Sequence, residues 1–143
     1  MSNETKTITL HVTPMGKPRM TQQDKWKKRP CVMRYRAFAD EIRRQASGKI
    51  PDDINNLSWV AYLPIPKTIK KAEKVARAGA LHLMKPDRDN IDKAILDALF
   101  KEDSGIAIGT LEKRWDDGSG PRIELSWNEP DDPSEHWDHH SRP

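Results

Sequence analysis

The sequence has 143 residues, of which 35% are hydrophobic and 33% charged, with a formal net charge of +3. This length and composition predict a single small domain with a modest core, and the lone cysteine, Cys31, excludes an internal disulfide or a cysteine zinc site. No apolar run is long enough to cross a bilayer and no signal peptide opens the chain, so we expect a cytoplasmic protein without membrane contact.

The first predicted element is a strand at Thr7–Val12, whose alternating pattern places Ile8, Leu10 and Val12 on the core face. The loop that follows, to about Pro30, combines most of the basic charge of the chain with an aromatic side chain. This mixture is typical of phosphate contacts combined with base stacking, although a solvated basic loop is the alternative. The candidate DNA-binding residues of this region are Lys17, Arg19, Lys25, Trp26, Lys27, Lys28 and Arg29.

Two helices and a strand follow. A helix is predicted at Met33–Ala46, with a broad apolar face formed by Met33, Ala37, Phe38, Ala39, Ile42 and Ala46. The continuously apolar segment Leu57–Leu63 predicts a strand in the middle of the sheet. A short basic helix is predicted from a cap at Thr68 to Arg77, closed by Gly79. It offers a second candidate DNA-binding surface, made of Lys70, Lys71 and Lys74.

The most informative segment is an amphipathic helix with an acidic start. Its apolar stripe consists of Ile91, Ala94, Ile95, Ala98 and Leu99, and Asp89 or Asn90 is the expected cap. Asp87, Asp89 and Asp92 crowd the lead-in, and clustered carboxylates repel each other unless a cation compensates them. A site for a hard divalent cation is one interpretation, with Lys93 one turn further on. An ordinary acidic first turn with salt bridges is the other.

The C-terminal part predicts a strand at Ile106–Trp115, a hairpin turn at Asp116–Gly120 and a returning strand at Arg122–Trp127. Residues 128–143 are acidic, contain proline and histidine, and are predicted to form a disordered tail, which leaves residues 1–127 as the domain. The order of elements indicates an α+β fold with a mixed sheet of about four strands packed by helices.

One long motif resembles a known family, the RusA-type Holliday junction resolvases. The motif is Lys85-Pro-Asp-x-Asp-Asn-Ile-x-Lys-Ala-Ile-x-Asp-Ala-Leu99, followed by Glu102-Asp103-Ser-Gly-Ile106. Lys17 and Arg19 also match the Lys-Pro-Arg pattern of that family. The resemblance implies a homodimeric, Mg²⁺-dependent endonuclease, with Mn²⁺ as a substitute and no small-molecule cofactor. Since these enzymes are encoded largely by phages and prophages, it also implies the cytoplasm of a bacterial host.

The resemblance also implies roles for particular residues. The aspartates of its motif fall on Asp87, Asp89 and Asp103, and its helix lysine falls on Lys93. Glu102 stands where the family usually has aspartate, so we expect it to join the metal ligands with a longer reach. From the residues alone, Asp87 and Asp89 supply two metal ligands, and Asp103 is the nearest candidate for a third.

The expected function is therefore the resolution of four-way DNA junctions by paired symmetric nicks, in recombination and repair. Two alternatives remain open at this stage. One is a nuclease for other branched DNA, such as forks or flaps. The other is a junction-binding protein without catalysis, in which the acidic residues are structural.

Overall fold

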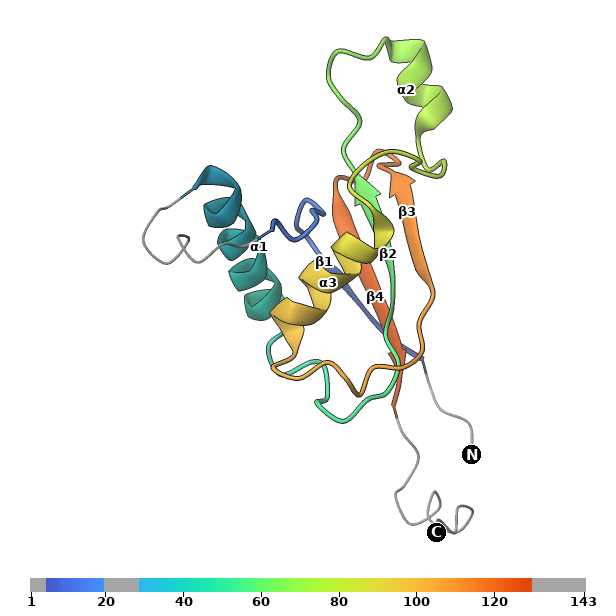
Figure 1. Ribbon diagram of the computed structural model, residues 1–143. Helices are drawn as coiled ribbons and strands as arrows, with labels where there is room; N and C mark the ends of the chain where they lie inside the picture. Colours follow the sequence, from blue (N-terminus) through green and yellow to red (C-terminus); the bar gives the residue numbers. More distant parts are fainter. Residues whose placement is uncertain (1–4, 20–28, 130–143) are drawn as a thin grey trace, which may run out of the picture.

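The computed structural model describes residues 5–19 and 29–129. Its elements follow the predicted order of strand, helix, strand, helix, helix, strand and strand (Figure 1). They are β1 (Thr5–Leu10), α1 (Pro30–Ala46), β2 (Ser58–Leu63), α2 (Lys71–Arg77), α3 (Arg88–Leu99), β3 (Leu111–Trp115) and β4 (Arg122–Asn128). The predicted α+β class with a four-stranded mixed sheet is confirmed.

The sheet has the strand order β1-β4-β2-β3. β4 pairs antiparallel with both β1 and β2, whereas β2 and β3 are parallel. A parallel pair needs a crossover connection, and here the crossover contains α2 and α3. As predicted, β2 is an interior strand, because β4 and β3 flank it.

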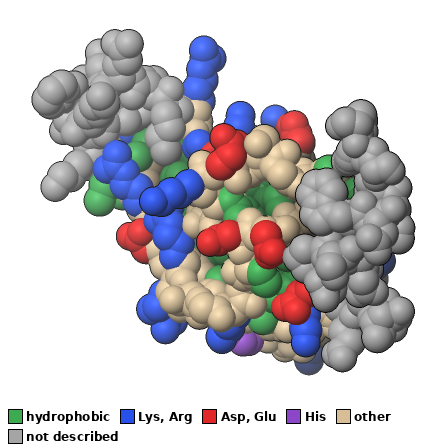
Figure 2. Space-filling view, turned by 90° about the horizontal axis from the view of Figure 1, so that it is seen from below, with side chains coloured by type: hydrophobic (Ala, Val, Ile, Leu, Met, Phe, Trp, Pro, Cys, Tyr) green, Lys and Arg blue, Asp and Glu red, His purple; other side chains and the backbone are tan. Residues whose placement is uncertain are grey.

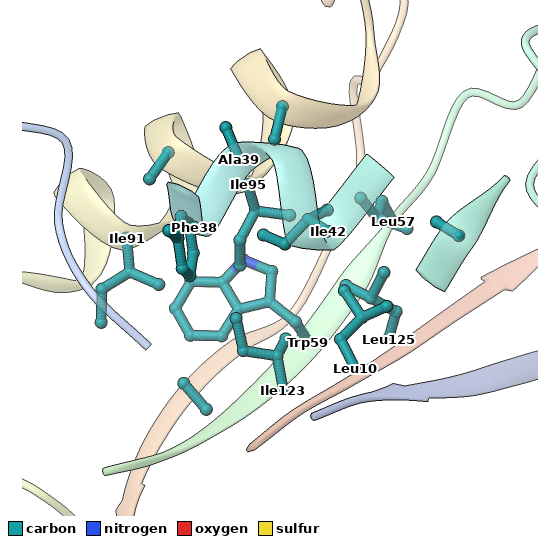
Figure 3. Close-up of a cluster of buried hydrophobic side chains, with 14 of the residues drawn as sticks. Leu10, Phe38, Ala39, Ile42, Leu57, Trp59, Ile91, Ile95, Ile123 and Leu125 are labelled. Atoms are coloured by element: carbon teal, nitrogen blue, oxygen red, sulfur yellow. The ribbon is translucent and has the colours of Figure 1, made fainter. Parts of the chain in front are cut away.

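The core lies between the sheet and the pair of helices α1 and α3, which pack against each other on one face of the sheet (Figure 1). Trp59 of β2 is 1% exposed and stands in the middle of this core, with Ile91 and Ile95 of α3 and Phe38 of α1 around it (Figure 3). Ile123 and Leu125 of β4 complete the floor of the core. The predicted apolar stripe of α3 is thus the face that the helix buries.

The buried face of α1 differs from the predicted one. Met33 and Ala37 are exposed, while Val32 and Tyr35, which were not assigned to the core, are buried. The helix begins three residues earlier, at Pro30, and proline suits a first helical turn because its missing N–H has no intrahelical partner there. The full buried set is Val32, Tyr35, Phe38, Ala39, Ile42 and Ala46.

Several predicted boundaries were wrong. The predicted hairpin between the last two strands does not form, since β4 pairs with β1 and β2 and not with β3. The third strand begins at Leu111 rather than Ile106, because the preceding segment makes only one isolated bridge, between Asn56 and Ile108. In that segment Gly109 passes so close to the Leu57 carbonyl that a Cβ atom would lie 2.1 Å from its oxygen.

The first strand runs from Thr5 to Leu10 rather than from Thr7 to Val12, and only Leu10 of its predicted core face is fully buried. The helix caps also differ from prediction. Lys70, not Thr68, precedes α2, and Asp87, not Asp89 or Asn90, precedes α3. Neither residue caps its helix with a side-chain hydrogen bond.

Candidate active site

The candidate site is centred on the start of α3. Asp87 is the N-cap residue, and its carbonyl oxygen accepts hydrogen bonds from the N–H groups of Asn90 and Ile91, at 3.1 Å each. Asp89 lies in the first turn. Both side chains are exposed, and within the described residues no hydrogen bond or ion pair engages their carboxylates. The positive end of the helix dipole is their main local compensation.

The loop that leads into this site is held by the sheet. Lys113 of β3 donates hydrogen bonds from Nζ to the carbonyl oxygens of Met84, at 2.5 Å, and Pro86, at 2.8 Å. The N–H of His82 also donates to the carbonyl oxygen of Lys113, at 2.9 Å. The position of Asp87 therefore depends on a lysine that follows it by more than twenty residues in the chain.

The segment after β1 approaches the same helix start from the other side. A Cβ atom on Gly16 would lie 3.1 Å from the side-chain nitrogen, Nδ2, of Asn90, so glycine permits this close approach. The N–H of Lys17 donates to the carbonyl oxygen of Asn90, at 3.3 Å. The Lys17 ammonium reaches along α3 to the Asp97 carboxylate, at 2.5 Å, and lies 5.9 Å from the centre of the Tyr35 ring. The hydrogen bond that the Lys17 ammonium donates to the Asp97 carboxylate raises the pKa of Lys17 above its usual value.

A cationic cavity of about 400 Å³ opens beside the first turn of α3. Its lining is Lys17, Pro18, Arg19, Asn90 and Lys93. Three of these five residues are basic, and all three were candidate site residues from the sequence. The structure thus brings Lys17, Arg19 and Lys93 together around Asn90, which follows Asp89 in the chain.

The third aspartate of the lead-in, Asp92, has a structural partner. Its carboxylate accepts a hydrogen bond from the buried indole N–H of Trp59, at 2.9 Å. Asp92 therefore ties α3 to the central strand of the sheet, and this bond satisfies a polar group that the core would otherwise leave without a partner.

Glu102 and Asp103 do not join Asp87 and Asp89 in one chain. They follow the last residue of α3, and the 12 residues of that helix span about 18 Å. Figure 1 shows the segment that contains them at the end of the sheet where β2 and β3 begin, whereas α3 starts near the opposite end. Across residues 5–19 and 29–129, no three His, Cys, Asp or Glu side chains come together to hold a metal ion.

The surroundings of Glu102 are different in kind. Figure 2 looks onto the end of the molecule where segments 47–57 and 100–110 lie, and it shows Asp and Glu side chains around a hydrophobic patch. A cavity of about 480 Å³ at Glu102 is lined also by Asp52, Leu99, Phe100 and Lys101. The N–H of Ser104 donates to the Glu102 carboxylate, at 3.1 Å.

The second basic surface lies on α2, which buries none of its residues and projects beyond the sheet (Figure 1). Lys70 and Lys71 are exposed and Lys74 is half-buried.

Arg29 donates a hydrogen bond to the carbonyl oxygen of Arg19, at 2.9 Å, which brings the two ends of the basic loop together. Four other candidate DNA-binding residues lie outside the described residues: Lys25, Trp26, Lys27 and Lys28.

Sequence reasoning missed Lys113 and Asn90 as members of the site. Asn90 was considered only as a helix cap, whereas it contacts Gly16 and lines the cationic cavity. Lys113 gave no signal in the sequence, because its partners are backbone carbonyls and any residue type supplies those.

The arrangement combines two carboxylates that make no hydrogen bond or ion pair in the described part of the chain with lysine and arginine side chains at one helix start. Mg²⁺ is commonly bound by one or two carboxylates, with water and substrate phosphate as further ligands, so Asp87 and Asp89 fit such an ion. The basic cavity beside them suits the phosphates of a nucleic acid. The site is therefore suited to metal-assisted chemistry on a phosphodiester.

Comparison with known proteins agrees with this chemistry. The family model described as endodeoxyribonuclease RusA matches residues 10–126, which is most of the chain. A search of curated proteins finds no match. No helix in the described ranges is long and apolar enough to span a membrane.

Proposed function

Because the chain belongs to the RusA endodeoxyribonuclease family, we propose that it resolves four-way DNA junctions by paired, metal-dependent nicks. The observation that best supports the proposal is the start of α3. There, Asp87 and Asp89, whose carboxylates have no partner within residues 5–19 and 29–129, lie beside a cavity lined by Lys17, Arg19 and Lys93. A structural acidic turn is a poorer account, because the aspartates with structural partners on this helix are different ones, Asp92 and Asp97.

We propose Mg²⁺ as the cofactor, with Mn²⁺ as a substitute, held by Asp87 and Asp89. When bound, the ion supplies an activated water molecule and neutralises charge on the leaving oxygen. Lys93 lies on the wall of the cavity, where its ammonium group can donate to a phosphate oxygen as negative charge develops. Lys17 and Arg19 bind and orient neighbouring phosphates, and the lysines of α2 extend this basic surface.

We further propose a homodimer, since two opposed strands of a four-way junction are related by an approximate twofold axis. A second protomer also gives Glu102 and Asp103 a route to the site. In their own chain these carboxylates follow the far end of α3, so a partner protomer is the route by which we expect them to reach Asp87 and Asp89. Mixed dimers of Asp89→Asn and Asp103→Asn chains would then regain one intact site, while each variant alone stays inactive.

The decisive experiment is the nicking of labelled four-way junctions, forks, flaps and duplexes in Mg²⁺. We expect symmetric nicks in the junction by the wild type, and their loss in Asp89→Asn with junction binding retained. Asp53→Asn is the matched control, because Asp53 is exposed and lies in the turn before β2. Wild-type protein that binds junctions without nicking them in Mg²⁺ or Mn²⁺ would refute the proposal. A preference for forks or flaps would reassign the substrate.

A further inference from the structure

The loop before the candidate site exposes three apolar side chains within four consecutive residues, 81–84. Leu83 is 83% exposed, Met84 is 61% exposed and Leu81 is 53% exposed. We call Leu81, Leu83 and Met84 the apolar ridge. Single exposed apolar residues are ordinary, but a group of three at the entrance to a polar site calls for an explanation.

Leu81 and Leu83 of the ridge are exposed because of how the backbone pairs at this point. Leu81 forms an antiparallel bridge with Arg114, and the N–H of Trp115 donates to the carbonyl oxygen of Ala80, at 2.8 Å. Side chains alternate in such an extended segment, so His82 turns inward and the leucines on either side turn outward. His82 is 4% exposed, and its ring packs on the Trp115 ring, with 4.2 Å between their centres.

The ridge is also rigidly held. The Lys113 ammonium binds the carbonyl oxygen of Met84, and the His82 N–H binds the carbonyl oxygen of Lys113. Arg77, which ends α2, lies 5.2 Å from the Trp115 ring, so this ring anchors both the helix and the loop. Burial of His82 near Lys113 lowers the pKa of the imidazole, which stays uncharged at neutral pH. The backbone that carries Leu83 and Met84 is therefore held to the sheet, while their side chains face solvent.

Most charged side chains near the ridge in the chain are basic, the exceptions being Glu73, Asp87 and Asp89. Lys85 and Arg88 are exposed on its C-terminal side, and the lysines of α2 precede it in the same projecting arm of the chain. A twofold contact between two copies centred here would oppose these cations to themselves, which is unfavourable. A stable protein interface also needs about 20–30 residues on each side, far more than the ridge offers. A polyanion with an accessible apolar interior suits the surface better.

We propose that Leu83 and Met84 insert between base pairs at the branch point of the bound DNA. Leucine and methionine are among the side chains that proteins use as wedges between base steps, at the cost of unstacking each step. A branch point lowers this cost, because stacking is already interrupted there. The ridge lies three residues before Asp87, so insertion fixes the scissile strand relative to the carboxylates. This inference rests on the proposed junction substrate and adds how the branch point is recognised.

The test uses a four-way junction with 2-aminopurine at the branch point, in Ca²⁺ to allow binding without nicking. The wild type should raise the 2-aminopurine fluorescence several-fold, and the double variant Leu83→Ser, Met84→Ser should not. The double variant should also nick junctions at least about tenfold more slowly in Mg²⁺, with duplex affinity unchanged. Ile108→Ser is the matched control, because Ile108 is 67% exposed but lies at the opposite end of the sheet.

The outcomes separate this inference from the proposed function. Nicking of junctions by the wild type with no fluorescence change, or full activity of the double variant, would overturn the wedge and leave the resolvase proposal intact. Failure of the wild type to bind junctions would overturn both. If sedimentation shows that the double variant has lost a dimer that the wild type forms, the ridge is a subunit contact and the wedge is wrong.

Discussion

The aspartates of α3 fall into two groups that differ in what surrounds them. Asp92 binds the indole of Trp59 and Asp97 binds the ammonium of Lys17, so both attach the helix to other parts of the fold. Asp87 and Asp89, at the start of the helix, are exposed and have no partner among the described residues. Sequence spacing alone does not distinguish them, since all four are aspartates close to one helix. Hydrogen-bond and ion-pair partners, rather than clustering in the sequence, therefore separate the structural carboxylates from the candidate ligands.

The largest expected effect comes from the group without partners. Asp87→Asn should lower junction nicking by about 100-fold or more, because it removes charge from the proposed metal site. The melting temperature should change little, because the carboxylate has no hydrogen bond or ion pair among the described residues, and the lost attraction to the helix dipole is offset by relief of the repulsion from Asp89. Nicking assays and thermal unfolding on the same preparation test both parts. Full activity in this variant would erase the distinction between the two groups.

A smaller loss of activity is expected from the support of the site. Lys113→Met removes the hydrogen bonds to the carbonyls of Met84 and Pro86 and loosens the loop before Asp87. We expect kcat for nicking to fall about 10- to 100-fold while KM changes little, since a displacement of about 1 Å at a reacting group has effects of this size. Lys49→Met, at an exposed site, is the control. An unchanged kcat would show that the loop holds its position without Lys113.

The group with partners should affect stability rather than catalysis. Asp92→Ala leaves the buried indole N–H of Trp59 without an acceptor, which should lower the free energy of unfolding by about 1–3 kcal/mol. Nicking per folded molecule should be retained. In the Trp59→Phe background the same substitution should cost much less, and urea unfolding of the four proteins measures this coupling. Equal costs in both backgrounds would show that Asp92 stabilises the helix by another route.

The smallest expected effect lies outside α3 and depends on pH. Arg122 donates two hydrogen bonds to Asp117, at 3.1 Å each, and this lowers the pKa of that carboxyl to about 2. Because the pKa is lower in the folded than in the unfolded protein, the contribution is complete above about pH 4 and is lost as the pH falls toward 2. The stability difference between wild type and Asp117→Asn should therefore shrink across that range. A difference that is constant with pH would contradict this account.

Much of the fold could be predicted because the relevant signals are local. The stripe of α3 and the order of the elements follow from periodicity and turn residues along the chain. The pairing of β4 with β2 could not be predicted in this way, since it depends on which strand lies nearest in space. Asp116 and Asp117 have the composition of a hairpin turn, yet they hold Arg122 while β4 passes to the far side of β2.

In the candidate site, too, local signals could be read from the sequence and contacts between distant segments could not. The carboxylates at the start of α3 and the basic residues that line the cavity were candidates from their types and spacing. Asp103 was also a candidate ligand, but within one chain it follows the far end of a helix of three turns, so its place among the metal ligands stays a prediction. The role of Lys113 could not be predicted, because it donates hydrogen bonds to backbone carbonyl oxygens, which every residue type supplies.

The parallel pairing of β2 and β3 has a consequence for how the protein folds. Every residue between Leu63 and Leu111 belongs to one connection, and that connection contains α2, the apolar ridge and α3. The pairings of β4 close even longer loops, since Tyr62 pairs with Arg122 and Leu10 pairs with Ile123. We therefore expect β2 and β3, together with the candidate site between them in the chain, to become ordered before β4 enters the sheet. Pulse-labelled hydrogen exchange would then protect the amides of β3 before those of β4.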